Sequence, residues 1–434
     1  MKKLILSLVA STLSLGMFTP LISIAADEQV ELDFAAIETA YGPEVWPEII
    51  EAYKEVKPNV TINLTQEKEL EDAITPRMQS GNYPDVVMLG LSREKALPET
   101  LIKDKGLAVL NDVLTMQIPG EEGTVESKLL DGFTDSTSTN PYNDGDTYLM
   151  PMFYSPTGLF YNKYLFEEKG WNIPTTWEDM WNLSKEAGDV SLFTYPVAGY
   201  LDTLFASLIN NKGGTDLFAK AMAYDPEVWK GQEMTDIFNT LGELAAHTES
   251  TTVANANPSD YTRNQQLILD NKALFVPNGT WVVGEMADAP RVDGFEWGMM
   301  ATPTFEADAD RYAYTFIEHI WIPEAAKNKE AAQEFIAFLY SDKAADIFLK
   351  HGAVQPIQGM VDKLEDDQKA FYSVYEEGVL PAMGGFVSTQ SIPGVDLKAT
   401  LYGTFDAVVS GDTTVEDWQQ QVVNMMEQFH NLAN

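Results

Sequence analysis

The stretch "PDVVMLGL", residues 84–91, decides the fold class, because a short apolar run that ends in turn residues is typical of a strand buried on both faces. Upstream, "VELDFAAI" (30–37) and "NVTINLTQ" (59–66) predict two further strands. Helices are predicted between them at 43–58 and 69–81. A strand-helix-strand-helix-strand run predicts an α/β domain with a mainly parallel sheet.

The remaining chain predicts more than one such unit, since 434 residues are enough for at least two domains. Residues 115–147 are polar and predict a loop that ends the first α/β run. Beyond it, a helix is predicted over 175–188, beginning at Thr175 or Thr176 and ending at Gly188. No internal repeat or low-complexity tract is visible in the sequence.

The N-terminus has the pattern of a secretory signal peptide. Lys2 and Lys3 precede an uncharged stretch over 4–26, which contains helix breakers and ends in the small residues "SIAA". Cleavage is expected near Ala25 or Ala26, which makes the mature protein exported. The alternative is an uncleaved membrane anchor, which the breaks in the apolar stretch disfavour.

Charge and cysteine content exclude several classes of partner. The formal net charge is −38, and cleavage of the signal would remove two lysines and no acid. Nucleic acids and anionic membranes are repelled by such a chain, so the expected ligand is neutral or cationic. The sequence has no cysteine, which excludes thiol catalysis, thiolate metal sites and iron-sulfur clusters.

No catalytic motif is present, so an enzyme is not predicted. The histidines are scattered and form no H-E-x-x-H, and neither a G-x-S-x-G nor a phosphate-binding glycine loop occurs. Asn143, Asp144 and Asp146 weakly resemble a calcium loop, but its twelve-residue pattern and closing Glu are missing. We therefore predict neither a metal nor another cofactor.

Aromatic residues recur beside glycine, proline or polar turns. Each ring alone is more readily explained as core, but flat aromatic faces next to acids and amides are what a sugar site requires. The aromatic residues in such positions are Tyr83, Tyr154, Tyr200, Trp281, Tyr314 and Phe386.

The segment "FVPNGTWVV", residues 275–283, is the most specific of these. Pro277, Asn278 and Gly279 are expected to end a strand and to be followed by Trp281 at the start of a helix. Trp281 is then either a plug of the core below the turn or a flat surface facing a ligand.

Four segments in this order resemble the extracellular carbohydrate-binding proteins of ATP-driven importers. They are "YPDVVMLG" (83–90), the stretch 151–180, "NGTWVVGEM" (278–286) and the stretch 328–357. The most specific piece is "GLFYNKYLFEEKGWNIPTTWEDM" (158–180). The resemblance covers nearly the whole mature chain.

This resemblance implies the maltose-binding-protein-like fold, in which two α/β lobes are joined by three crossings and ligand is bound in the cleft between them. Crossings are expected near 149–155, 299–304 and 340–343. After a signal peptide at 1–26, the first lobe would hold 27–148 and 302–340, and the second would hold 149–301 and 341–434.

The same resemblance implies the ligand contacts, at strand ends and helix starts that face the cleft. For Arg93 the alternative is a salt bridge with a surface acid, and for His319 it is a hydrogen-bonded structural role. The expected contacts are Glu38, Gly90, Arg93, Glu318 and His319 in the first lobe, and Tyr154, Ser155, Tyr200, Asp202, Trp281, Glu285 and Phe386 from the hinge and second lobe.

The predicted function is a monomeric receptor for a neutral sugar or short oligosaccharide that delivers it to a membrane permease. A subgroup that binds N-acetylglucosamine or its oligomers is suggested by "GTWVVGEMADAP", with Glu285 as a candidate contact. The alternatives are a secreted glycan hydrolase or lyase, and the same fold with a polyamine ligand. Asp27 stands where a lipid-anchored relative would carry Cys, so no lipid anchor is expected on this sequence.

Overall fold

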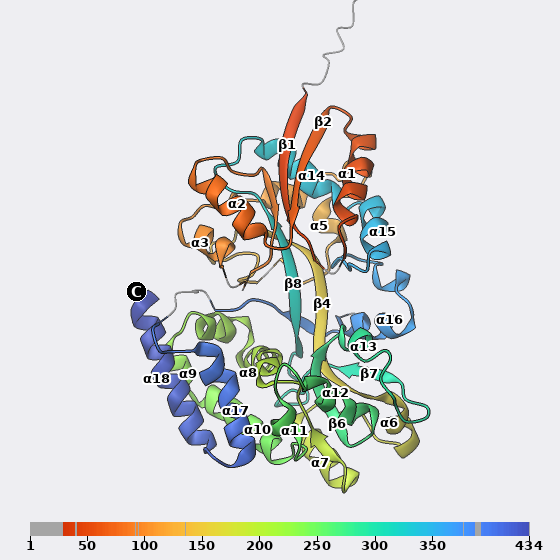
Figure 1. Ribbon diagram of the computed structural model, residues 1–434, viewed down its shortest axis with the longest axis vertical. Helices are drawn as coiled ribbons and strands as arrows, with labels where there is room; N and C mark the ends of the chain where they lie inside the picture. The colour runs from red at the N-terminus through yellow and green to blue at the C-terminus, as the bar shows by residue number, and fades with distance from the viewer. Residues whose placement is uncertain are drawn as a thin grey trace, which may run out of the picture.

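A computed structural model describes residues 29–39, 41–91, 93, 95–134, 136–375, 377–386 and 392–433. The predicted signal peptide, with its cleavage site and Asp27, lies outside these residues. The molecule has an upper and a lower half, and two long strands run between them through the middle of Figure 1.

The strands form one sheet, with the order β2-β1-β3-β8-β4-β6-β5 and with β7 and β9 paired to β4 and β8. Pairing is parallel among β1, β2 and β3, as the sequence predicts, and antiparallel where β8 meets β3 and β4. The strands are β1 (Val30–Ile37), β2 (Val60–Glu67), β3 (Val86–Met88), β4 (Leu149–Asn162), β5 (Ser191–Phe193), β6 (Ala273–Gly279), β7 (Trp297–Met300), β8 (Tyr312–Trp321) and β9 (Leu380–Ala382).

Helices surround both halves of the sheet (Figure 1). Those of the upper half are α1 (Val45–Val56), α2 (Leu70–Gln79), α3 (Leu97–Lys103), α4 (Asn111–Thr115), α5 (Val125–Lys128), α14 (Lys329–Phe338) and α15 (Asp342–Lys350). Those of the lower half are α6 (Lys163–Lys169), α7 (Trp177–Ala187), α8 (Leu201–Met222), α9 (Pro226–Lys230), α10 (Gln232–Ala246), α11 (Thr252–Asn255), α12 (Tyr261–Leu269), α13 (Val282–Glu285), α16 (Asp366–Tyr372), α17 (Thr404–Ser410) and α18 (Val415–Ala433).

Burial on both faces explains the apolar strands of the upper half. In β1, Phe34 and Ala36 belong to the core that α1 and α14 cover, whereas Ala35 and Ile37 belong to the core on the side of α2 and α3. Figure 1 shows these two helix groups on opposite sides of β1 and β2. Side chains alternate between the faces, so a strand with helices on both sides needs apolar residues at every position.

Local signals fixed the helix ends in the lower half. Helix α7 begins with a capping box, in which the Thr176 hydroxyl accepts the Asp179 N–H at 3.1 Å and the Asp179 carboxylate accepts the Thr176 N–H at 3.0 Å. The helix ends at Gly188 in a backbone conformation with φ +65°. This confirms Thr176 and Gly188 as the predicted ends.

The chain passes between the halves along β4, along β8 and between α15 and α16. Strand β4 coincides with the first expected crossing at 149–155, but the other two passages lie downstream of 299–304 and 340–343. Helix α15 packs against α1 in the upper half, whereas α16 packs against β4 and β7. The assignment of residues to two lobes therefore stays a prediction, with its second and third crossings moved to β8 and to the segment after α15.

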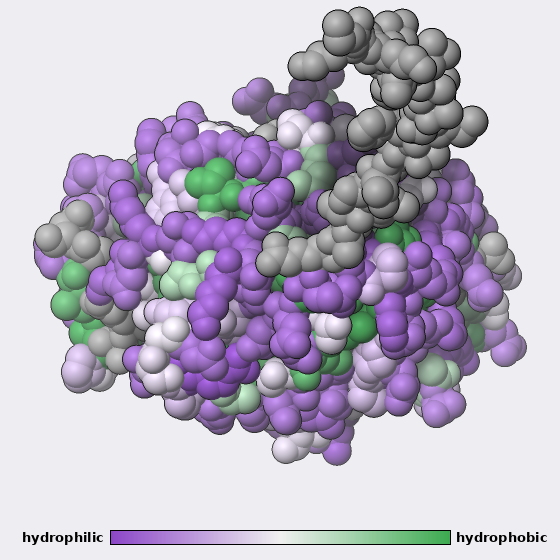
Figure 2. All heavy atoms as spheres, turned by 90° about the horizontal axis from the view of Figure 1, so that it is seen from above, coloured by the Kyte–Doolittle hydropathy of each residue, from purple (hydrophilic) through white to green (hydrophobic). Residues whose placement is uncertain are grey.

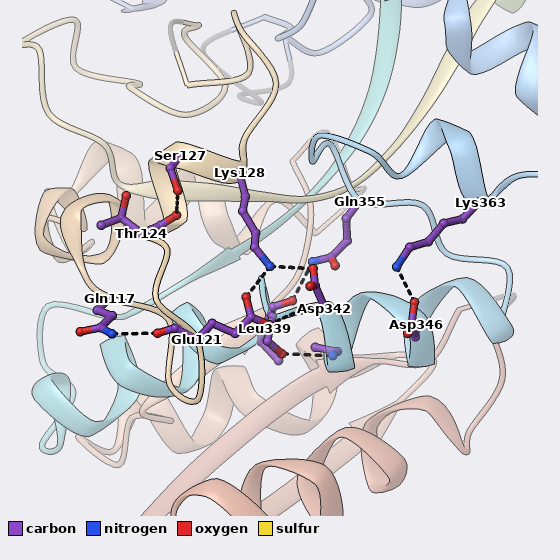
Figure 3. Close-up of polar contacts among 12 residues, drawn as sticks. Gln117, Glu121, Thr124, Ser127, Lys128, Leu339, Asp342, Asp346, Gln355 and Lys363 are labelled. Atoms are coloured by element: carbon purple, nitrogen blue, oxygen red, sulfur yellow. Dashed lines mark hydrogen bonds and ion pairs between the residues drawn. The ribbon is translucent and has the colours of Figure 1, made fainter.

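Figure 3 shows why residues 340–343 stay in the upper half. The Lys128 ammonium, at the end of α5, pairs with the carboxylates of Glu121 and of Asp342 at the start of α15. Glu121 also accepts the Asp342 N–H at 2.6 Å. This three-residue network holds the corner between α14 and α15 against the loop 117–128.

The strand around Pro277 is longer than predicted. Pro277 and Asn278 do not end β6, since the strand continues to Gly279 and pairs with β4 as far as Thr157. The missing N–H of Pro277 is tolerated because β5 pairs with β6 only as far as Phe275, which leaves one edge of β6 without a strand partner.

The molecular surface fits an acidic, hydrated protein. Figure 2 views the molecule from above, at the end where β1 and β2 lie, and shows mainly hydrophilic residues with scattered hydrophobic ones. Among the described residues, none of the helices combines the length and the apolar character needed to cross a membrane.

Candidate ligand-binding cleft

A cavity of about 680 Å³ lies where the two halves meet. Helix α8 and the segment 395–402 supply most of its wall, the turn 384–386, Trp229 of α9 and Phe429 of α18 complete it, and Arg93 reaches it from the upper half. The wall combines charged groups with aromatic rings, namely Arg93, Asp202, Lys398, Tyr224, Trp229, Tyr314, Phe386 and Tyr402. Such a lining suits a ligand with both apolar faces and polar edges.

Asp202 is the acid that α8 presents to this cavity. It is the second residue of the helix, and its carboxylate accepts the Thr203 N–H at 2.7 Å. Burial raises the pKa of Asp202 to about 6, and Lys398 partly offsets that rise. At neutral pH the side chain is a carboxylate that accepts hydrogen bonds or attracts a cation.

Phe386 stands in the wall of the cavity as part of an aromatic stack. Its ring centroid is 5.1 Å from that of Tyr224 at an interplanar angle of 10°, and 6.5 Å from that of Trp229 at 21°. The stack fixes the orientation of Phe386, which remains half-buried and lines the cavity.

Trp281 is not a core plug, because 36% of its surface is exposed. The indole lies over Gly279, where an added Cβ would meet ring carbons at 2.1, 2.2 and 2.5 Å. The indole N–H donates to the Tyr200 hydroxyl at 3.2 Å. The absence of a side chain at Gly279 thus allows the indole to pack against the backbone there, and the Tyr200 hydroxyl orients the ring. Trp281 lies at the start of α13, as the sequence predicted.

Hydroxyl groups connect this tryptophan to the hinge strands. Thr280, next to Trp281, shares a hydrogen bond of 2.6 Å with Ser155 of β4. Ser155 is in turn the register partner of Phe316 on β8, and Phe316 is 49% exposed. Paired residues point to the same face of a sheet, so these side chains lie together.

Glu318 links β8 to the upper half. Its carboxylate accepts the Tyr41 hydroxyl at 3.1 Å. Burial raises the pKa of Glu318 to about 7, while the Tyr41 hydrogen bond and the charge of Arg93 lower it. The structure therefore brings Glu318 and Arg93 together, as the resemblance implied.

His319 faces the core instead of the cleft. It is 1% exposed, and within the described ranges neither ring nitrogen has a hydrogen-bond partner. Burial lowers the pKa of His319 to about 3, so the ring is neutral. The expected alternative of a hydrogen-bonded structural histidine is thus only half right, since the ring is buried but not paired.

The other predicted residues of the upper half lie at the ends of β1 and β3. Arg93 donates to Glu71 at 3.1 Å, which realises the alternative of a salt bridge, although Glu71 is a buried acid and not a surface one. Glu38 pairs with Lys68 at 3.6 Å. Gly90 lies against β8, where an added Cβ would be 3.8 Å from the Cα of Glu318.

Tyr154 is a core residue, contrary to its predicted place in the cleft. It is 3% exposed, and its ring packs edge-on against Phe133 and Tyr372. Beyond an irregularity of the β4–β8 register between Pro151 and Phe153, Tyr154 pairs with Ile317, whereas Ser155 pairs with the exposed Phe316. Ser155 rather than Tyr154 therefore points to the cleft.

Glu285 lies apart from the main cavity. Its carboxylate accepts the Gln265 amide at 2.8 Å, and it borders a separate surface depression of about 510 Å³. It is one helical turn beyond Trp281. Burial raises the pKa of Tyr200, and the negative charge of Glu285 adds to that rise.

The weak calcium pattern has a structural explanation. The Asp144 carboxylate accepts the Asp146 N–H at 3.1 Å and the Tyr148 hydroxyl at 2.9 Å. The acids therefore stabilise their own turn. In the part of the chain that the structure describes, no group of three or more metal-ligating side chains occurs.

Sequence reasoning missed Tyr41, Thr280 and Phe316, and it missed Tyr224 and Trp229 behind Phe386. Thr280 adjoins Trp281 and was within reach of the argument made for that residue. The alternation of side chains in "YTFIEHIW" (314–321) places Tyr314, Phe316 and Glu318 on one face of a strand. Because Tyr314 and Glu318 were already candidates, this pattern could have indicated Phe316 as well.

Two α/β halves with a lined cavity between them define a two-lobed ligand-binding receptor. Residues 38–346 match the family of bacterial extracellular solute-binding proteins, so the chain belongs to that family. This is a family of solute-binding proteins and not of enzymes, which excludes the hydrolase or lyase alternative.

Among relatives, the diacetylchitobiose binding protein NgcE of Streptomyces coelicolor is 24% identical over 297 residues, which is 65% of this chain and 60% of NgcE. The chain spans about 60% of the length of NgcE and of two other curated relatives, the maltotriose-binding protein of Pyrococcus abyssi and the galactooligosaccharide-binding protein of Bacillus subtilis.

Solved structures share the fold over almost their whole length. The bacterial solute receptor AcbH has a TM-score of 0.71 at 18% identity, covering 92% of this chain and 99% of AcbH. RafE of Streptococcus pneumoniae at 17% identity gives a TM-score of 0.65 for its apo form, over 93% of this chain and 98% of RafE. The RafE complex with raffinose gives 0.58 over 93% and 99%. These similarities confirm the α/β periplasmic-binding-protein fold.

Proposed function

We propose that this chain is the non-catalytic sugar-binding component of an ABC importer. It captures a neutral saccharide outside the membrane, closes its two lobes around it and delivers it to a membrane permease. The observation that carries the proposal is the cavity between the halves, where stacked aromatic rings and Asp202 from one half meet Arg93 from the other. Aromatic faces accept the C–H faces of sugars, and charged groups hydrogen-bond their hydroxyls.

The comparisons support this ligand class. The names of NgcE, AcbH and RafE connect them with diacetylchitobiose, β-D-galactopyranose and raffinose, respectively. A ligand that contains N-acetylglucosamine is the finer hypothesis, supported by the sequence similarity to NgcE.

The test is a thermal-shift screen of the purified protein with N-acetylglucosamine, chitobiose, galactose, raffinose and maltotriose, with spermidine as the cationic comparison. A saccharide at a hundred times its Kd stabilises the folded state by ~2.7 kcal/mol and raises the Tm. We also expect a smaller radius of gyration in X-ray scattering with that saccharide. If no sugar shifts the Tm at millimolar concentration, or if only spermidine does, the proposal is wrong.

A matched pair of variants locates the binding. Asp202→Asn removes the carboxylate that lines the cavity, so the Kd for the saccharide should rise by about tenfold or more, since a hydrogen bond to a charged group contributes ~1.5 kcal/mol or more. Asp288→Asn changes an exposed acid of the lower half and should leave the Kd unchanged. Equal effects of the two variants would contradict a site at Asp202.

A further inference from the structure

Phe316 is an aromatic side chain that the fold leaves uncovered. It is 49% exposed, and among the described residues no aromatic ring pairs with it and no hydrophobic cluster includes it. Single exposed apolar residues are common, so the exposure of Phe316 alone does not indicate a binding role. The position of Phe316 on a strand that connects the two halves is the observation from which we argue.

Both hinge strands open to solvent at the same place. In β4, which the structure describes at all fourteen positions, Ser155 is partly exposed and the thirteen other residues are buried. In β8, the exposed residue is Phe316, with both ends of the strand buried. Ser155 and Phe316 are register partners, so this pair marks an opening in the sheet between the halves, bordered by the partly buried Tyr314, Ile317 and Glu318.

This opening adjoins Trp281. The Ser155 hydroxyl bonds to Thr280, the residue before Trp281, which is itself 36% exposed. Strands β8 and β6 pair with opposite edges of β4, and neighbouring strands lie ~4.8 Å apart, so the backbones of the strand that carries Phe316 and the strand that leads to Trp281 are on the order of 10 Å apart. The exposed rings therefore flank one hydrogen-bonded pair of hydroxyls.

The opening also continues into the cavity. Side chains two residues apart on a strand share a face, which places Tyr314 and Glu318 on the same side of β8 as Phe316. Tyr314 lines the cavity, and Glu318 accepts the Tyr41 hydroxyl from the upper half. A ligand that extends from the cavity toward Trp281 would pass Phe316.

We propose that Phe316 is a second stacking surface of the cleft, which acts with Trp281 to select saccharides of two or more rings over monosaccharides. This inference rests on the proposed function. The two rings belong to segments on opposite edges of β4, so a saccharide of two or more rings gains a second stacking contact when one sugar unit lies on each ring. Phe316 is thus a specificity residue for chain length.

The test measures Kd by calorimetry for two homologous series, which are N-acetylglucosamine, chitobiose and chitotriose, and galactose, melibiose and raffinose. For the series that binds, we expect Phe316→Ala to weaken the trisaccharide by at least tenfold and the monosaccharide by less than threefold. Phe316→Tyr keeps a flat ring and should retain the preference for longer saccharides. Phe316→Leu keeps the apolar volume without the ring and should lose that preference.

Tyr164→Ala is the matched control, because Tyr164 is 43% exposed and packs over Gly294, away from the hinge strands. It should change no Kd by more than twofold. The inference is wrong if wild type and Phe316→Ala show the same dependence on chain length, or if the variant weakens the monosaccharide as much as the trisaccharide. If wild type binds no saccharide of either series, this inference is wrong, whereas the proposed function fails only if no sugar of the thermal-shift screen binds.

Discussion

The substitution Gly279→Ala tests whether the packing of the Trp281 indole against Gly279 contributes to ligand binding. The change adds one methyl group and leaves the indole in the sequence. That methyl would meet three ring carbons at 2.1, 2.2 and 2.5 Å, whereas ordinary van der Waals contacts begin near 3.4 Å. The indole must therefore move by about 1 Å or more, and its 3.2 Å hydrogen bond to the Tyr200 hydroxyl is lost or lengthened.

The expected loss of saccharide affinity can be estimated from the exposed area of the Trp281 indole. A tryptophan buries up to ~250 Å² when fully covered, so the 36% that is exposed leaves ~90 Å² for a ligand. At ~25 cal/mol per Å² this area contributes about 2 kcal/mol, or roughly a thirtyfold change in Kd. Gly279→Ala should lose up to that amount of saccharide affinity. Overpacking should also lower the free energy of unfolding by ~1 to 3 kcal/mol.

The assay combines calorimetric Kd values with chemical denaturation. Gly284→Ala is the control, because an added Cβ there meets nothing within 4 Å, and it should leave both quantities nearly unchanged. A double-mutant cycle with Trp281→Ala separates the indole from other effects. In the Trp281→Ala background, Gly279→Ala should cost little further affinity. Wild-type affinity and stability in Gly279→Ala would refute the packing of the indole over Gly279.

Two further outcomes follow from single side chains. The pKa of Glu318 is raised to about 7, so between about pH 4 and 7 the folded state binds more protons than the unfolded state, and raising the pH lowers the free energy of unfolding. Denaturation without ligand at pH 5 and 8 should show a larger loss toward pH 8 in wild type than in Glu318→Gln, and an identical change in both would contradict the burial of this acid. Thr176→Ala removes the cap of α7 and should cost ~0.5 to 2 kcal/mol of stability with no change in Kd, whereas a loss of affinity would connect α7 to the cleft.

Local patterns predicted the fold well where local contacts determine it. Strand β1 has the bounds that alternation and burial suggested, and α7 starts at the predicted cap. The assignment of residues to lobes stays a prediction, because the sequence does not show which half an element packs against. The third crossing, near 340–343, was expected only from the resemblance, and Lys128 and Glu121 contact Asp342 from more than 200 residues away in the chain.

The residues of the candidate site could be predicted only where they are neighbours within one segment of the sequence. Trp281, Gly279 and the start of α13 are neighbours in sequence, and the exposure of the indole was within reach of that segment alone. Tyr154 was placed in the cleft because the resemblance puts ligand contacts at this part of the hinge, and only the structure shows that its ring packs in the core. Phe316 was missed because its exposure depends on its register with Ser155, and register between distant strands is a property of the fold.

The position of the hinge opening explains how one ligand can couple the two halves. A strand that passes between two hydrophobic cores is buried at both ends and uncovered in the middle, as β8 is around Phe316. The middle of β8 carries Glu318, whose carboxylate accepts a hydrogen bond from Tyr41 and whose pKa is lowered by the charge of Arg93 in the upper half. It also carries Tyr314, which lines the cavity together with Asp202. Under the proposed function, a ligand held there gains its fullest contacts with both halves when they approach each other. Its affinity is then higher for the closed arrangement, and that difference is the free energy available to drive closure.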